Sequence, residues 1–243
     1  MKHIVLSLLL LSIGHAEDFE TGAVKRSDGA AFYLNTIPQI ARLSNGQLLT
    51  VWWVSGKGQP KGSIYGASSS DSGRTWSEPK LLIEDAVKTS GDPNILVDGK
   101  KVWVFSTQVF VPNKINKSWI AMVRSDDDGK TWSKPVDVPI PRQYVAGKQH
   151  NGIKLRDGTY MFGVSWDKWP EIGMAARTEG EMDLTTGVML SKDGEHWTLH
   201  GAVHTFVDKI SPNSTNGLAE PSLVELDNGE VLMILRSGDS FHY

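Results

Sequence analysis

The residues best suited to chemistry stand at the starts of four apolar stretches. They are Thr36, Asp92, His150 with Asn151, and Glu220. Each lies just ahead of a proline or glycine that precedes the glycine of an Asn-Gly or Asp-Gly pair by six to eight residues. Histidine is the side chain most easily tuned for proton transfer at neutral pH, so proton transfer is the chemistry that this set favours. A histidine at a strand start equally fits a structural loop residue, and Asp92 before proline fits a common strand entry.

A tryptophan and an aspartate in the third stretch indicate sugar binding. Trp166 and Asp167 open the longest interruption of the strand pattern, which runs to Asp183 and also holds Trp169 and Glu171. We expect this interruption to be a long loop, and flat apolar faces beside carboxylates are typical of sugar-binding clefts. Tryptophans so close together equally fit packing beneath the loop.

Four predicted hairpins must position these residues. At residues 40–53, 95–105, 153–164 and 223–235, an apolar stretch meets Asn-Gly or Asp-Gly and continues as another apolar stretch. Asn-Gly and Asp-Gly between β-rich segments are the strongest short-range hairpin signals. Helical periodicity is absent, so the predicted fold class is all-β. Equivalent hairpins would bring the four strand starts together at one end of the domain.

A short signature recurs after the first three hairpins. It reads Ser-x-Asp-x-Gly-x-Thr-Trp at 69–76 and 125–132, and a contracted copy with His in place of Thr occupies 191–197. The Asp can accept turn N–H groups, Gly supplies a positive φ, and Trp closes the turn onto a core. The residues with these structural roles are Asp71, Gly73, Trp76, Asp127, Gly129, Trp132, Asp193, Gly194 and Trp197. Their spacing fits the period of propeller blades.

These signatures resemble the Asp-box (BNR) repeats of the sialidase superfamily. The resemblance implies a six-bladed β-propeller, of which this chain holds about four blades, with the boxes in turns away from the active site. The fourth hairpin has no box before the sequence ends at Tyr243, so we expect the chain to be incomplete. A natural four-bladed propeller is the alternative.

The same resemblance assigns roles to two residues of the fourth hairpin. In sialidases a glutamate at the position of Glu220 orients and polarises a tyrosine nucleophile. An arginine at the position of Arg236 belongs to a triad that holds the substrate carboxylate. Guanidinium groups bind carboxylates bidentately, and a buried carboxylate can act as a base toward a phenol, so the chemistry suits both roles.

The first hairpin departs from the sialidase pattern. Thr36 stands where the first triad arginine belongs, in the stretch Asn35-Thr36-Ile37-Pro38. The loop 55–63 contains no carboxylate, although the family carries an aspartate acid/base there. The nucleophile and the third arginine would lie beyond Tyr243. We therefore expect an altered sugar specificity.

Composition limits the class of protein. Residues 1–16 read as a signal peptide, with a basic start, an apolar segment and Gly-His-Ala, and residues 17–243 form the sialidase-like domain. The absence of cysteine suits a bacterial periplasmic or extracellular protein with a large core. A net charge of −3 without basic clusters argues against nucleic acid, and we expect no membrane insertion, no cofactor, no metal site, and a monomer when the chain is complete.

Three functional hypotheses remain open. The first is a glycoside hydrolase acting on an acidic or decorated glycan. The second is a polysaccharide lyase in which His150 and a tyrosine abstract the proton α to a uronate carboxylate that Arg236 neutralises. The third is a non-catalytic glycan-binding propeller, which would tolerate the altered first hairpin without compensation.

Overall fold

The computed structural model describes residues 23–58, 61–110, 118–142, 145–146, 150–167, 183–203 and 216–237. These residues form strands, turns and loops, which confirms the all-β prediction. In chain order the strands are β1 (Leu34–Arg42), β2 (Leu48–Ser55), β3 (Gly62–Ser69), β4 (Lys80–Ile83), β5 (Lys88–Asp98), β6 (Lys101–Phe110), β7 (Ser118–Ser125), β8 (Val136–Val138), β9 (Val145–Ala146), β10 (Ile153–Lys154), β11 (Tyr160–Asp167), β12 (Asp183–Ser191), β13 (Thr198–Val203), β14 (Asn216–Glu225) and β15 (Val231–Ser237). Among the described residues, no helix has the length and apolar character that crossing a membrane requires.

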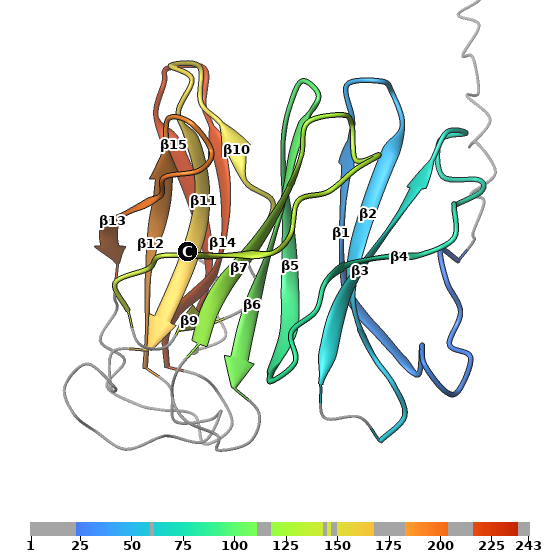
Figure 1. Cartoon of the computed structure of the whole chain (residues 1–243). Coiled ribbons are helices and arrows are strands. Elements are labelled where there is room, and N and C mark those ends of the chain that lie inside the picture. Colours follow the sequence, from blue (N-terminus) through green and yellow to red (C-terminus); the bar gives the residue numbers. More distant parts are fainter. Residues whose placement is uncertain are drawn as a thin grey trace, which may run out of the picture.

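The strands form sheets that follow one another along the chain (Figure 1). Strands β1–β4 make one open antiparallel sheet and β5–β8 make a second, each with sequence neighbours paired. Strands β10–β13 make the third, with β9 beside β11, and β14 and β15 form a hairpin. The start of β14 pairs in parallel with the start of β12, at Asn216 with Asp183 and Gly217 with Leu184. This contact joins the hairpin to the third sheet.

The four predicted hairpins are present as β1–β2, β5–β6, β10–β11 and β14–β15. Their turn glycines Gly46, Gly99, Gly158 and Gly229 have φ values of 85°, 55°, 85° and 88°. Residues with a Cβ avoid this region, which is why glycine follows Asn or Asp in these turns. All four turns lie at the upper end of the molecule in Figure 1, so the first strand of each sheet begins at the lower end.

The core fills the spaces between neighbouring sheets. Phe105 of the second sheet contacts Phe162 and Trp197 of the third, with ring centroids 4.5 and 5.3 Å away. Val51 of the first sheet and Val104 of the second lie fully buried in the cluster between those two sheets. Because burial of one large apolar side chain contributes roughly 1.5–3 kcal/mol, contacts between the sheets stabilise the fold beyond the strand ladders themselves.

The first box is a turn between β3 and β4 organised by one carboxylate. The Oδ1 atom of Asp71 accepts the backbone N–H of Thr75 at 2.8 Å and the hydroxyl of Ser69 at 2.8 Å, and Oδ2 accepts the Thr75 hydroxyl at 2.6 Å. Gly73 donates its N–H to Ser69, and the Trp76 indole donates to the Gly73 carbonyl at 3.0 Å. These donors, led by the Thr75 hydroxyl, lower the pKa of Asp71 to about 2.

The second box repeats this geometry between β7 and β8. Asp127 accepts the Ser125 hydroxyl at 2.8 Å and both the N–H and the hydroxyl of Thr131, at 2.9 and 2.6 Å. The Thr131 hydroxyl, followed by the Thr131 N–H, lowers the pKa of Asp127 to about 2. The two turns are therefore built from the same set of donors on one aspartate.

The contracted third box replaces threonine with a histidine that makes the equivalent contact. The His196 ring Nδ1 lies 2.7 Å from Oδ2 of Asp193, and the His196 N–H donates to Oδ1 at 2.8 Å. The backbone N–H of His196 is the largest cause of the lowered pKa of Asp193, and the Asp193 carboxylate in turn raises the pKa of His196. The sequence variation at this position thus preserves a donor to the box carboxylate.

The second and third boxes also contact the preceding sheet. Asp128, with φ at 57°, accepts the N–H and hydroxyl of Ser44 in the β1–β2 turn at 3.1 and 2.6 Å. Gly194 lies against Trp103 of the second sheet so closely that a Cβ would stand 2.3 Å from the indole ring. Each of these boxes closes its own turn and fastens it to a neighbour.

We predict that Asp127→Asn weakens the dependence of stability on acid pH. The pKa of Asp127 is about 2 in the fold against 3.8 as its ordinary value, so its contribution is complete above 3.8 and is lost as the pH falls through about 2. Thermal unfolding from pH 6 to pH 2 should show a shallower fall in Tm for the variant, from a lower starting value. Asp227→Asn in the β14–β15 turn is the control, and an Asp127→Asn curve parallel to wild type would contradict the prediction.

We predict the opposite pH dependence for the third box. Because Asp193 raises the pKa of His196, the pair stabilises the fold fully below pH 6.5 and loses this contribution as the pH rises through the elevated pKa. His196→Thr restores the donor of the other boxes without a titrating group. Its Tm should change less than that of wild type between pH 6 and pH 9, and equal changes would show that the pair contributes nothing.

Candidate active site at the bulges of the first strands

A β-bulge occurs at the same place in three first strands, those of two sheets and that of the last hairpin. The register shifts lie between Thr36 and Gln39, between Gly91 and Asn94, and between Ala219 and Ser222. In each bulge a non-glycine residue before proline has a positive φ: Ile37 at 53°, Asp92 at 48° and Glu220 at 54°. Such backbone costs about 1–3 kcal/mol per residue and concentrates at functional sites. All three bulges lie toward the end of the molecule opposite the hairpin turns.

The structure refines the alignment of the strand starts. Ile37, and not Thr36, occupies the position of Asp92 and Glu220, because Ile37 is the residue before proline. Thr36 pairs with Trp53 in the same register in which Ala219 pairs with Arg236. Trp53 is therefore the counterpart of Arg236 in the first sheet, and two uncharged side chains stand at this level of β1 and β2.

Glu220 and Arg236 form an ion pair across the β14–β15 hairpin. Nε of Arg236 lies 3.0 Å from Oε2 of Glu220, and the two side chains are 35% and 18% exposed. A half-buried pair of this kind is costly to break, because the remaining charge would lose its partner. A guanidinium donates from five N–H groups, so contact with Glu220 through Nε is compatible with binding a second carboxylate.

A glycine in β11 leaves room for Pro221, the residue after Glu220. Gly163 faces Pro221 so closely that a Cβ on Gly163 would stand 2.3 Å from Cγ and 2.6 Å from Cβ of the proline ring. The third sheet therefore fixes the bulge that holds Glu220. Sequence reasoning did not identify Gly163, because its role depends on a contact between two sheets.

His150 and Asn151 lie in the segment that enters β10. His150 is exposed, whereas Asn151 is partly buried. The Asn151 amide accepts the Ile95 N–H at 3.0 Å and donates to the Ile40 carbonyl at 2.9 Å. These contacts engage both ends of the Asn151 amide with backbone, which favours a structural role over substrate binding for this residue.

Trp166 and Asp167 lie within β11 and not on the expected loop. Trp166 is buried in the core between sheets and pairs with Val145 and Thr185 in the strand ladders. The Arg142 guanidinium lies over its ring, 4.8 Å from the ring centroid. Asp167 is also buried. Trp169 and Glu171 lie outside the described residues, and Asp92 is partly buried at its bulge.

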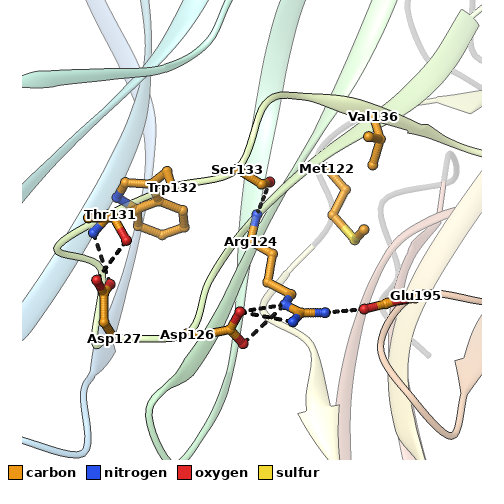
Figure 2. Close-up of a pocket in the computed structure, with 9 residues that line it drawn as sticks. All are labelled: Met122, Arg124, Asp126, Asp127, Thr131, Trp132, Ser133, Val136 and Glu195. Carbon is orange, nitrogen blue, oxygen red and sulfur yellow. Dashed lines mark hydrogen bonds and ion pairs between the residues drawn. The ribbon is translucent and has the colours of Figure 1, made fainter.

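A pocket of about 570 Å³ lies beside the second box, away from the bulges. Figure 2 shows Arg124 between two acidic side chains of this pocket, Asp126 at 2.9 Å and Glu195 of the third box. The hydrogen bond that Arg124 donates to Asp126 is the largest cause of the raised pKa of Arg124. This cation is thus already neutralised by carboxylates, and it ties the second sheet to the third.

No group of three or more His, Asp or Glu side chains with the arrangement of a metal site occurs in the described part of the chain. The charged groups at the bulges are Asp92, Glu220 and Arg236, which come from separate strands. They can bind an acidic or hydroxyl-rich ligand and accept a proton.

Known proteins resemble the chain over most of its length. Residues 41–243 match the model of the BNR repeat-like domain family. A sialidase of Bacteroides fragilis (strain YCH46) is 26% identical over 233 residues, which are 82% of this chain and 39% of that relative. A sialidase of Clostridium perfringens is 26% identical over 229 residues, which are 82% of this chain and 54% of that relative.

Solved structures show the shared fold. Hadza microbial sialidase Hz136 superposes with a TM-score of 0.68 at 22% identity, over 84% of this chain and 42% of that one. Trypanosoma rangeli sialidase in complex with the inhibitor DANA gives 0.59 at 17% identity, over 84% and 34%. The chain spans only about two-fifths to one-half of the two curated relatives above.

We predict that Gly163→Ala destabilises the protein through Pro221. The added methyl meets the proline ring at 2.3 Å, and overpacking of this kind costs about 1–3 kcal/mol. Urea unfolding of Gly163→Ala, Pro221→Ala and the double variant should give a coupling energy, because Pro221→Ala removes the nearest clashing atom. Gly66→Ala in β3 is the control, since the only atom within 3.0 Å of its added methyl is the flexible end of Leu82. Additive changes in the free energy of unfolding at positions 163 and 221 would contradict direct packing of Pro221 against Gly163.

Proposed function

The chain belongs to the family of BNR repeat-like domains, and we propose that it forms part of an exported, sialidase-like glycoside hydrolase acting on an acidic or otherwise decorated glycan. The observation that carries this proposal is the ion pair of Glu220 and Arg236 on a strained bulge. The sialidases among its relatives support the reaction class.

In this proposal the two residues of the pair act on different parts of the substrate. Arg236 holds a carboxylate or another anionic substituent of the sugar through charge-assisted hydrogen bonds. Glu220 accepts the proton of a phenolic nucleophile, and its contact with the guanidinium orients the carboxylate. The positive φ of Glu220 holds its backbone in a bulge that Pro221 and Gly163 maintain.

The first sheet supports a change of specificity within the proposed class. Thr36 and Trp53 stand where a second guanidinium would be needed to grip the carboxylate from the other side. Residues 55–58 and 61–63, the described part of the adjacent loop, contain no carboxylate. We propose that the sugar presents an uncharged group to the first sheet and its anionic group to Arg236.

A polysaccharide lyase is the second candidate function. The exposed His150 at the entrance to β10 and the uncharged first sheet favour it, because proton abstraction α to a uronate needs a base and a cation but no paired carboxylates. The products distinguish the two reactions. A lyase releases an unsaturated uronide that absorbs in the ultraviolet, whereas a hydrolase does not.

The consecutive open sheets and the likeness to sialidase structures support a six-bladed propeller of which this chain supplies about four blades. The apolar segment at residues 1–16 supports export to the periplasm or the outside of a bacterial cell. The partner would be a glycan, and the closed protein a monomer.

We predict that Glu220→Gln and Arg236→Ala each strongly lower turnover of the acidic glycan by the full-length protein. Loss of the base is expected to lower kcat by about 10²–10⁴-fold. Loss of a charge-assisted contact worth roughly 1.5–3 kcal/mol lowers kcat/KM about 10- to 150-fold or more. Release of reducing ends and absorbance of unsaturated uronides from a panel of acidic polysaccharides and sialylated glycans are measured together.

The controls are Glu225→Gln on the same hairpin and Arg124→Ala at the peripheral pocket, which should retain turnover. Aryl sialosides should be poor substrates for the wild type, because Thr36 supplies no guanidinium. Efficient release of sialic acid would contradict the altered specificity. Full activity of Glu220→Gln would remove the residue at the centre of the proposed mechanism.

A further inference from the structure

The segment that enters the third sheet is fastened to the first strands of the two preceding sheets. Gly152 donates its N–H to the Ile95 carbonyl at 2.9 Å, and the Ile95 N–H donates to Oδ1 of Asn151 at 3.0 Å. Nδ2 of Asn151 donates to the Ile40 carbonyl at 2.9 Å. Ile40 lies in β1 and Ile95 in β5, so one residue connects three sheets. We call these three hydrogen bonds the Asn151 clamp.

The clamp fixes the position of this segment along strands β1 and β5. Ile40 and Ile95 each follow the strained bulge residue of their strand, Ile37 or Asp92, by three positions. Strand β10 runs from the clamp toward the hairpin turn at Gly158. His150, the residue before Asn151, therefore lies on the side of the clamp where the bulges stand, and it is exposed.

The proposed hydrolysis needs a proton donor that the first sheet does not offer in its described residues. Breaking a glycosidic bond to an ordinary alcohol requires protonation of the departing oxygen. The described part of the loop after β2 has no acid, and the nearest polar side chains of β1 and β2 at the bulge, Thr36 and Trp53, do not titrate near neutral pH. The clamp ties Asn151, the residue next to His150, to β1 and β5.

We infer that His150 supplies the proton to the leaving group and that Asn151 is its positioning residue, an inference that rests on the proposed hydrolase function. The His150 imidazolium gives a ring proton to the glycosidic oxygen while the bond from that oxygen to the anomeric carbon breaks, and the aglycone leaves as an alcohol. A nucleophile that has lost its proton to Glu220 bonds to the anomeric carbon. In the second half the neutral imidazole takes a proton from water, the water oxygen replaces the nucleophile, and Glu220 returns its proton.

The test compares two leaving groups on one sugar. The acidic sugar that the full-length wild type releases best is supplied as its 4-nitrophenyl glycoside and as its methyl glycoside. Nitrophenolate can leave as an anion without protonation, whereas the methoxy group must be protonated to leave as methanol. His150→Gln should lower kcat/KM on the methyl glycoside by about 10²–10⁴-fold and change kcat/KM on the nitrophenyl glycoside only a few-fold, because kcat/KM reports the step in which the aglycone leaves and not the attack of water that both substrates share.

Asn151→Ala should reproduce the same selective loss to a smaller extent, because the histidine is present but no longer held. Its thermal unfolding is measured in parallel, and His150→Gln carries the test if Asn151→Ala does not fold, since His150 is exposed and outside the core. His200→Gln on β13 is the matched control and should leave both substrates unaffected.

The outcomes separate this inference from the function on which it rests. Equal losses on both glycosides, or no loss, in His150→Gln would overturn the role of His150 while leaving the hydrolase intact. Absence of hydrolysis by the wild type on every acidic sugar would reject the proposed function and this inference with it. A selective loss in His150→Gln that Asn151→Ala, when folded, does not share would overturn the positioning role of Asn151.

Discussion

Proline cannot donate a hydrogen bond to a strand ladder, and this constraint shapes the end of the protein where the candidate site lies. At Pro38, Pro93 and Pro221 the first strand of a sheet gives up regular pairing, and the residue before each proline adopts a positive φ. Residues before proline avoid the right-handed helical region, and these three residues adopt left-handed backbone instead. The resulting bulge presents the side chain of the strained residue differently from its neighbours in the ladder. One such residue is Glu220, which meets Arg236 across the hairpin.

The hairpins and boxes could be predicted from local sequence because each depends on residues close together in the chain. Asn45-Gly46 and the box around Asp71 form turns whose donors and acceptors lie within a few positions. The strand starts were harder, because the residue before proline in β1 is the apolar Ile37 and the polar residue stands one position earlier. A polar residue such as Thr36 therefore resembles the equivalent of Glu220, although Ile37 occupies that position.

The features that sequence did not reveal depend on contacts between sheets. Trp166 has the composition of a sugar-binding loop residue, yet β11 continues through it and packs it into the core. Gly163 is an ordinary strand glycine until Pro221 is placed against it. Asn151 carries the side chain of a ligand-binding residue, but its amide is engaged by two backbones, 56 and 111 residues away in sequence. Such pairings require the relative placement of sheets, which turn chemistry does not encode.

The Asn151 clamp also bears on aggregation. Strands β1 and β5 are edges of their sheets, and an edge strand offers unpaired N–H and C=O groups to which a strand of another molecule can add. Ile40 and Ile95 would supply three of these groups at the middle of the two strands, but a side-chain amide and the Gly152 N–H already occupy them. An approaching foreign strand would have to displace them before its ladder could extend along β1 or β5. Asn151 and the Gly152 N–H thereby hinder intermolecular strand addition at both edges, where many proteins use a charged residue or a covering helix.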